Sequence, residues 1–141
     1  MTLDNEDRLA IIHVHLEKAE EAYESAVFLS ESRRDYNGAA NRAYYAMFHA
    51  EKALLHTRGI SGDSHKHVHM QLSNQFVKEG KLPNYTGSNI KYVETIRRIA
   101  DYSEQKSVTE EEVKKALIEI KNFMESAKKI LHDFEKELPN Q

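Results

Sequence analysis

The chain has 141 residues, enough for one domain with a hydrophobic core, and we predict a single helical domain over residues 1–141. The absence of cysteine excludes disulfides, zinc–thiolate sites and cysteine nucleophiles, and a formal net charge of -3 gives no overall attraction to nucleic acid. DNA binding is therefore not predicted, and binding of RNA or a nucleotide would need a local basic patch. Acidic residues near the amino terminus and the lack of a long apolar run favour a cytoplasmic protein with no signal peptide and no membrane span.

Two long helices are predicted in the first half of the chain. From Leu9 to Ser30, apolar and small residues recur at intervals of three and four, which predicts a helix over about residues 7–32. A second helix is expected over about residues 37–58, because Gly59 can adopt the left-handed conformation that ends a helix.

The next two predicted helices are shorter. Ser64 has the side chain of an N-cap for a third helix that continues to about Glu79. A fourth helix is predicted over about residues 88–103, with apolar residues at helical spacing on its inward side.

The last helix has the clearest start in the sequence. Thr109 and Glu112 form a capping box, and apolar residues alternate at intervals of four and three from Val113 to Leu138. Strand-type alternation occurs nowhere in the sequence, and the connections are short. We therefore predict an all-α fold, an up-and-down bundle of about five helices, three long and two shorter, with spare apolar surface that a homodimer would use.

The predicted second helix carries polar side chains opposite its apolar arc, which only Glu51 interrupts. At about 100° per residue, Arg42, Tyr45 and His49 fall along one line. One interpretation is a solvated face, or polar packing at a helix or dimer interface. The other is a site in which Arg42 and His49 bind a phosphate while Tyr45 stacks on a base.

Three histidines alternate with other residues where the third helix begins: His65, His67 and His69. His65 and His69 are one helical turn apart, a spacing that can hold zinc, but Asp63 is the only other ligand nearby in sequence. We therefore predict no metal site and no cofactor. We expect His65 and Lys66 to be polar groups that add to a basic patch near Arg42.

Three segments together resemble the HEPN domain family, specifically its small stand-alone bacterial and archaeal members. They are residues 42–50 (RAYYAMFHA), residues 64–66 (SHK) leading to 76–80 (FVKEG), and Arg97 followed by residues 100–102 (ADY). The resemblance covers nearly the whole chain and implies a helical bundle that is commonly dimeric. It also implies one of several activities: metal-independent ribonuclease, toxin of a toxin–antitoxin pair, or nucleotide-binding companion of a minimal nucleotidyltransferase.

The nuclease members of this family use an Arg and a His that follows it four to six residues later. The His exchanges a proton with the ribose 2′-hydroxyl or the leaving oxygen, and the Arg stabilises the charged transition state. Arg97 stands at the matching position, but Tyr102 occupies the place of the His, and an ordinary tyrosine pKa near 10 makes a poor proton carrier at neutral pH. Asp101 is four residues after Arg97, so the two can form a salt bridge or contribute to a ligand site.

We therefore favour a nucleotide- or RNA-binding component of a two-component, toxin–antitoxin-like system with a minimal nucleotidyltransferase as its partner. The binding candidates are Arg42, Tyr45, His49, His65, Lys66 and Arg97. One alternative is a metal-independent ribonuclease toxin that uses Arg97, Asp101 and Tyr102. A second alternative is a structural module that dimerises or tethers another protein.

Overall fold

The computed structural model describes residues 4–62 and 64–139, and these residues form five α-helices and no strand. The helices are α1 (Asn5–Glu31), α2 (Tyr36–His56), α3 (His65–Leu72), α4 (Thr86–Tyr102) and α5 (Glu110–Glu137). The predicted all-α fold with three long and two shorter helices is confirmed, and the boundaries agree to within about two residues. None of the helices in the described ranges is both long and apolar enough to cross a membrane.

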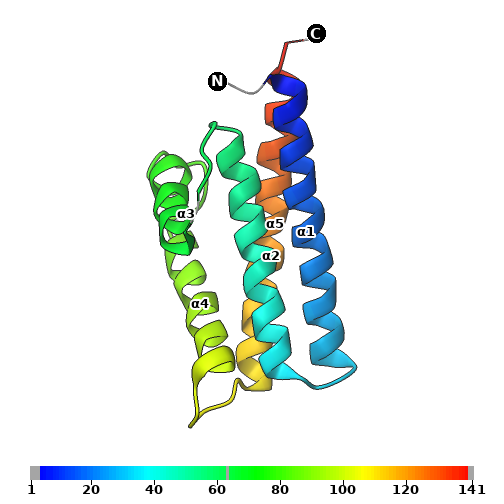
Figure 1. Cartoon of the computed structure of the whole chain (residues 1–141). Coiled ribbons are helices and arrows are strands. Elements are labelled where there is room, and N and C mark those ends of the chain that lie inside the picture. Colours follow the sequence, from blue (N-terminus) through cyan, green and yellow to red (C-terminus); the bar gives the residue numbers. More distant parts are fainter. Residues whose placement is uncertain (1–3, 63, 140–141) are drawn as a thin grey trace.

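Helix α2 is the centre of the bundle and contacts each of the other four helices. Figure 1 shows α1, α2 and α5 running lengthwise beside one another, with α3 and α4 on the side of α2 that faces away from α1. Because α2 is covered in this way, Arg42, Tyr45 and His49 are half-buried rather than exposed. This row is therefore a partly covered helix face and not a fully solvated one.

Side-chain caps explain where four of the helices begin. Asp4, Asp35, Ser64 and Thr109 each accept a hydrogen bond from the backbone N–H three residues later. At Thr109 the predicted capping box is confirmed, since the Glu112 N–H donates to Thr109 Oγ1 at 3.2 Å and the Thr109 N–H donates to Glu112 Oε1 at 3.0 Å.

The third helix continues beyond Leu72 as a π-helical turn, η1 (Ser73–Val77). Val68, Leu72 and Phe76 are spaced by four residues, so in a regular α-helix each would be rotated further from the core than the last. The wider π turn offsets this rotation and keeps Phe76 buried at 1% exposure. The predicted third helix is thus present, and the four-residue spacing of its apolar residues explains its π-helical turn.

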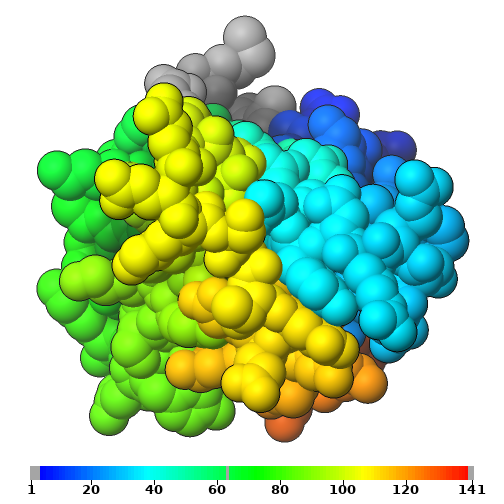
Figure 2. Space-filling model, turned by 90° about the horizontal axis from the view of Figure 1, so that it is seen from below, coloured from blue at the N-terminus to red at the C-terminus, as the bar shows by residue number. Residues whose placement is uncertain are grey.

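The lower end of the bundle in Figure 1 is held together by the connection between α4 and α5. The Val108 N–H donates to Asn37 Oδ1 at 3.0 Å, and Asn41 Nδ2 donates to the Asp101 carboxylate at 3.2 Å. Figure 2 views this end and shows the connection (yellow) next to the start of α2 (cyan). These contacts set the position of the end of α4 relative to α2.

Three histidines stack between α1 and α2. The ring of His15 lies between those of His49 and His56, with centroid separations of 5.3 and 5.5 Å, and the Nδ1 atoms of His15 and His49 are 3.1 Å apart. Burial, and then neighbouring basic groups, lower the pKa of both His15 and His49 to about 4. Both rings are therefore neutral at pH 7, and one Nδ1–H donates to the other Nδ1.

Replacing Thr109 with alanine removes the capping box and should lower the free energy of unfolding by about 1 kcal/mol. Urea unfolding followed by circular dichroism measures this loss. Thr95→Ala is the matched control, because Thr95 is exposed within α4 and does not cap a helix. An equal loss in both variants would show that the cap contributes nothing.

Acid should destabilise the fold through the stacked histidines. The folded pKa of about 4 for His15 and His49 lies below the ordinary value of 6.5, so the unfolded chain binds more protons between these values. Their contribution to the free energy of unfolding is complete above pH 6.5, and it is lost as the pH falls towards 4. The unfolding free energy of His49→Gln should therefore depend less on pH over this range than that of the wild type, whereas His132→Gln, at an exposed position, should behave as the wild type does.

Candidate functional site

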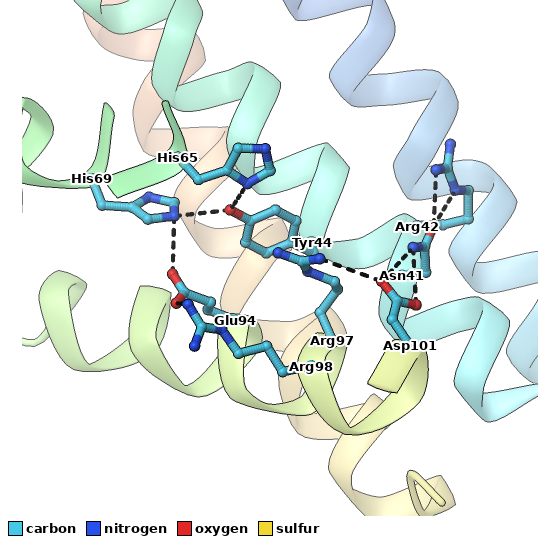
Figure 3. Close-up of polar contacts among 9 residues, drawn as sticks. All are labelled: Asn41, Arg42, Tyr44, His65, His69, Glu94, Arg97, Arg98 and Asp101. Carbon is cyan, nitrogen blue, oxygen red and sulfur yellow. Dashed lines mark hydrogen bonds and ion pairs between the residues drawn. The ribbon is translucent and has the colours of Figure 1, made fainter. Parts of the chain in front are cut away.

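Helices α2 and α4 together hold a row of polar side chains around Arg97 (Figure 3). The Arg97 guanidinium lies 4.5 Å from the centroid of the Tyr44 ring, and its Nη1 is 3.4 Å from Asp101. Asp101 also accepts from Asn41 Nδ2, and Asn41 Oδ1 accepts from Arg42 at 2.9 and 3.1 Å. The Arg97–Asp101 salt bridge considered from the sequence is present, and Arg42 joins the same row through Asn41.

Arg97 has unused hydrogen-bonding capacity. Its side chain is only 12% exposed, and its buried Nε has no partner among the described residues. Burial by itself lowers the pKa of Arg97, but the hydrogen bond to Asp101 and the neighbouring Tyr44 raise it above its usual value, so the guanidinium stays charged. A buried donor without an acceptor is unfavourable.

A second cluster meets at the hydroxyl of Tyr44, whose side chain is completely buried. Its oxygen is 2.5 Å from His65 Nδ1 and 3.0 Å from His69 Nε2. The other ring nitrogen of His69 is 2.7 Å from Glu51 Oε1, and the His65 ring stacks on Phe48 with the centroids 4.3 Å apart. The cluster thus links α2 to two of the three histidines of α3, His65 and His69.

Two carboxylates control the charge of His69. Glu51 Oε1 contacts one ring nitrogen, and Glu94 Oε2 lies 3.2 Å from the other. Burial alone would lower the pKa of His69, but the hydrogen bond and charge of Glu51, with the charge of Glu94, raise it. Burial and the same two carboxylates raise the pKa of Tyr44, which keeps its hydroxyl proton. Within the described chain, Oε2 of the wholly buried Glu51 has no hydrogen-bond partner.

The predicted binding residues fall into two groups and one outlier. Arg97 and His65 both adjoin Tyr44. Lys66, in contrast, is exposed and has no hydrogen bond or ion pair with other residues that the structure describes. It remains only a source of positive charge near His65 in the sequence.

Arg42, Tyr45 and His49 form the other group and line a hollow between α1 and α2. The Arg42 guanidinium lies 5.1 Å from the Tyr45 ring centroid. Because His49 is neutral at pH 7, Arg42 is the only cation of the three. The alignment predicted from the sequence is correct, but its cationic character comes from Arg42 alone.

The residues considered for a nuclease motif lie at the end of α4. Asp101 is engaged by both Arg97 and Asn41. Tyr102 is 72% exposed, and its ring centroid is 6.0 Å from the Arg97 guanidinium carbon. Tyr102 therefore lies at the edge of the polar row, close to solvent.

Two histidines of α3, His65 and His69, are arranged around the hydroxyl of Tyr44. The Tyr44 oxygen lies between nitrogens of His65 and His69. Across the described ranges, no group of three or more His, Asp or Glu side chains is placed to hold a metal ion. Asp63, the nearby carboxylate noted in the sequence, lies outside the described residues.

Sequence reasoning missed the buried half of this site. It assigned Tyr44 to the core, treated Glu51 as an interruption of the apolar arc, and did not consider Glu94. The available signal was the seven-residue spacing of Tyr44 and Glu51, which places a phenol and a carboxylate two turns apart on the same buried side of α2. Their partner His69 comes from a different helix, so spacing alone could not identify it.

Comparison with known proteins agrees with this fold. The HEPN domain family matches residues 12–131. Putative toxin MJ0605 of Methanocaldococcus jannaschii is 36% identical over 129 residues, covering 92% of this chain and 95% of the relative. A UPF0332 protein of Thermotoga maritima is 30% identical over 126 residues (89% and 95%), and Putative toxin MJ0142 of M. jannaschii is 32% identical over 116 residues (82% and 78%). The chain therefore belongs to the HEPN domain family.

Proposed function

We propose that this protein is the toxin-type component of a two-component system and binds the phosphates of RNA or of a nucleotide through Arg97. Two relatives that match most of the chain are named as toxins, which supports the biological class. The binding of a phosphate is supported by the charge, burial and hydrogen bonding of Arg97. It is a charged side chain that is only 12% exposed between α2 and α4, and its hydrogen bonding among the described residues is incomplete, because its buried Nε lacks an acceptor.

A phosphate suits Arg97 because guanidinium and phosphate form short, charge-assisted hydrogen bonds. The 3.4 Å distance to Asp101 is long for such a bond, so Arg97 is not fully satisfied inside the protein. Arg42 lies in the same polar row and can attract a second phosphate, while Tyr45 beside it offers an aromatic face for a base. An extended ligand with several phosphates and bases would use both groups.

The expected protein partner is a minimal nucleotidyltransferase, and the expected oligomer is a homodimer. Both are what the resemblance to the HEPN domain family implies. Exposed apolar side chains on α1, Val14 and Phe28 at 48% and 57% exposure, offer contact area for another chain. Light scattering gives the oligomeric state, and co-expression shows whether a genomically adjacent nucleotidyltransferase relieves growth arrest caused by this protein.

Arg97→Gln should weaken binding of a fluorescently labelled 2′-O-methyl RNA by roughly 10- to 100-fold, as expected for loss of a charge-assisted hydrogen bond. Fluorescence anisotropy at constant salt measures the affinity. Lys91→Gln is the control, because it makes the same change in net charge at an exposed position of α4. Equal affinities of the wild type and Arg97→Gln would contradict the proposal.

A further inference from the structure

We propose that a cavity between α4 and α5 binds a small organic ammonium ion, with the carboxylate of Glu119 as its counter-ion. The cavity lies apart from the site described above, because none of the residues that line it belongs to the row around Arg97 or to the cluster at the Tyr44 hydroxyl. The inference therefore goes beyond the proposed function, and either can fail without the other.

The floor of the cavity is apolar. Helix α4 packs against α5, and Figure 2 shows the two side by side (light green and orange). Ile90 and Val93 of α4, Ile120 of α5 and Met47 of α2 line the cavity, and all four side chains are buried. The carbon skeleton of a ligand would therefore be removed from water on several sides at once.

The connection before α4 supplies the remaining wall, and backbone hydrogen bonds fix its position. The Leu82 N–H donates to the Phe76 carbonyl at 3.1 Å, and the Thr86 N–H donates to the Pro83 carbonyl at 3.1 Å. Leu82 and Thr86 line the cavity and are themselves buried. The cavity is thus already formed in the free protein, so a ligand need not order this wall when it binds.

The size of the cavity limits the ligand. Its volume is about 70 Å³, which corresponds to roughly five to seven water molecules. A ligand with a similar number of non-hydrogen atoms fits, such as a short alkylamine or an amine that carries one ring. A nucleotide is much larger, so the cavity is not a second place for the ligand proposed at Arg97.

Glu119 provides the charge. It is the one charged side chain among the described residues that line the cavity, and only 15% of it is exposed. Its buried Oε2 has no hydrogen-bond partner in the described part of the chain. Its Oε1 lies 4.0 Å from Lys115 Nζ, and that ammonium is also 4.2 Å from the centroid of the Tyr92 ring. The carboxylate is therefore largely desolvated and only weakly compensated.

An ammonium ion supplies what Glu119 lacks. It brings a positive charge and three N–H donors, and Asn89, Asn122 and Ser126 also line the cavity with oxygens that can accept. Burial raises the pKa of Glu119, and the charge of Lys115 opposes this effect. A bound cation would act in the same sense as Lys115, whereas an anionic ligand would be repelled.

The test titrates benzylamine into the full chain with labelled methyl groups and follows the binding by NMR. The methyl signals of Ile90, Val93 and Ile120 should shift, with a dissociation constant of roughly 1 mM or below, while that of Ile12 on α1 should not. Benzyl alcohol, which has the same shape without the charge, should bind roughly 10-fold or more weakly. Unshifted cavity methyls, or equal affinity for both compounds, would overturn the proposal.

Glu119→Gln keeps the size of the side chain and removes its charge, so it should weaken benzylamine binding roughly 10-fold or more. Glu125→Gln is the matched control, because it makes the same change in net charge at an exposed position of α5. Ser126→Met adds volume to the wall and should weaken binding while Glu119 is kept. Thermal unfolding shows that each variant is folded. Affinity at the wild-type level in folded Glu119→Gln would contradict the proposal.

The pH dependence gives an independent readout. Affinity for benzylamine should fall as the pH drops through the raised pKa of Glu119, because the protonated carboxyl is no counter-ion. The other titratable groups around it are Lys115 on α5, Tyr92 on α4 and Tyr85 before α4, and neither lysine nor tyrosine changes charge in the acid range. In Glu119→Gln the affinity should not vary over this range, and a variation equal to that of the wild type would rule out Glu119.

A further arm separates a free amine from a lysine side chain of another protein. The cavity has room for a whole small molecule, so we assign it to a free amine. N-acetyl-lysine amide, whose backbone groups must stay outside, should bind less tightly than benzylamine. Tighter binding of the lysine derivative would assign the cavity to a peptide and overturn the proposal.

Discussion

The contact between Glu51 and His69 is the interaction on which the rest of the structure depends. Glu51 lies at 0% exposure on the central helix, where an unpaired carboxylate would cost several kcal/mol. His69 pairs with its Oε1 from α3, and Glu94 of α4 contacts the same imidazole. One histidine therefore ties three helices together and gives the short α3 a specific position against α2, which the burial of Val68 and Leu72 alone would leave less well defined.

The two sides of α2 use histidine in opposite ways. Towards α1, burial and then neighbouring basic groups lower the pKa of His15 and His49 to about 4, so they are neutral and pack as aromatic rings. Towards α4, carboxylates raise the pKa of His69. The residue type is the same, and the sign of the neighbouring charge decides its state. The charged histidine contacts therefore lie on the α4 side, although the histidines of the sequence are spread over both sides.

The sequence predicted those features that depend on neighbours along the chain. Helix periodicity, the Thr109 cap and the i,i+4 pairing of Arg97 with Asp101 all act over one or two turns, and each is observed. Contacts between residues far apart in sequence were not predicted. Glu51 and His69 are separated by two helix ends and a connection, so no periodicity in the sequence relates them.

The sequence by itself thus determined the helices, their order and a family resemblance, because local hydrogen bonding and apolar spacing are sufficient for these. Tertiary structure decided which polar groups act together. It placed Arg42, Tyr45 and His49 beside α1, and it brought His65 to Tyr44 and Arg97. The physical reason is that a polar side chain buried in a helical bundle must find its partner on another helix, and only the packing of the helices determines which one lies within hydrogen-bonding distance.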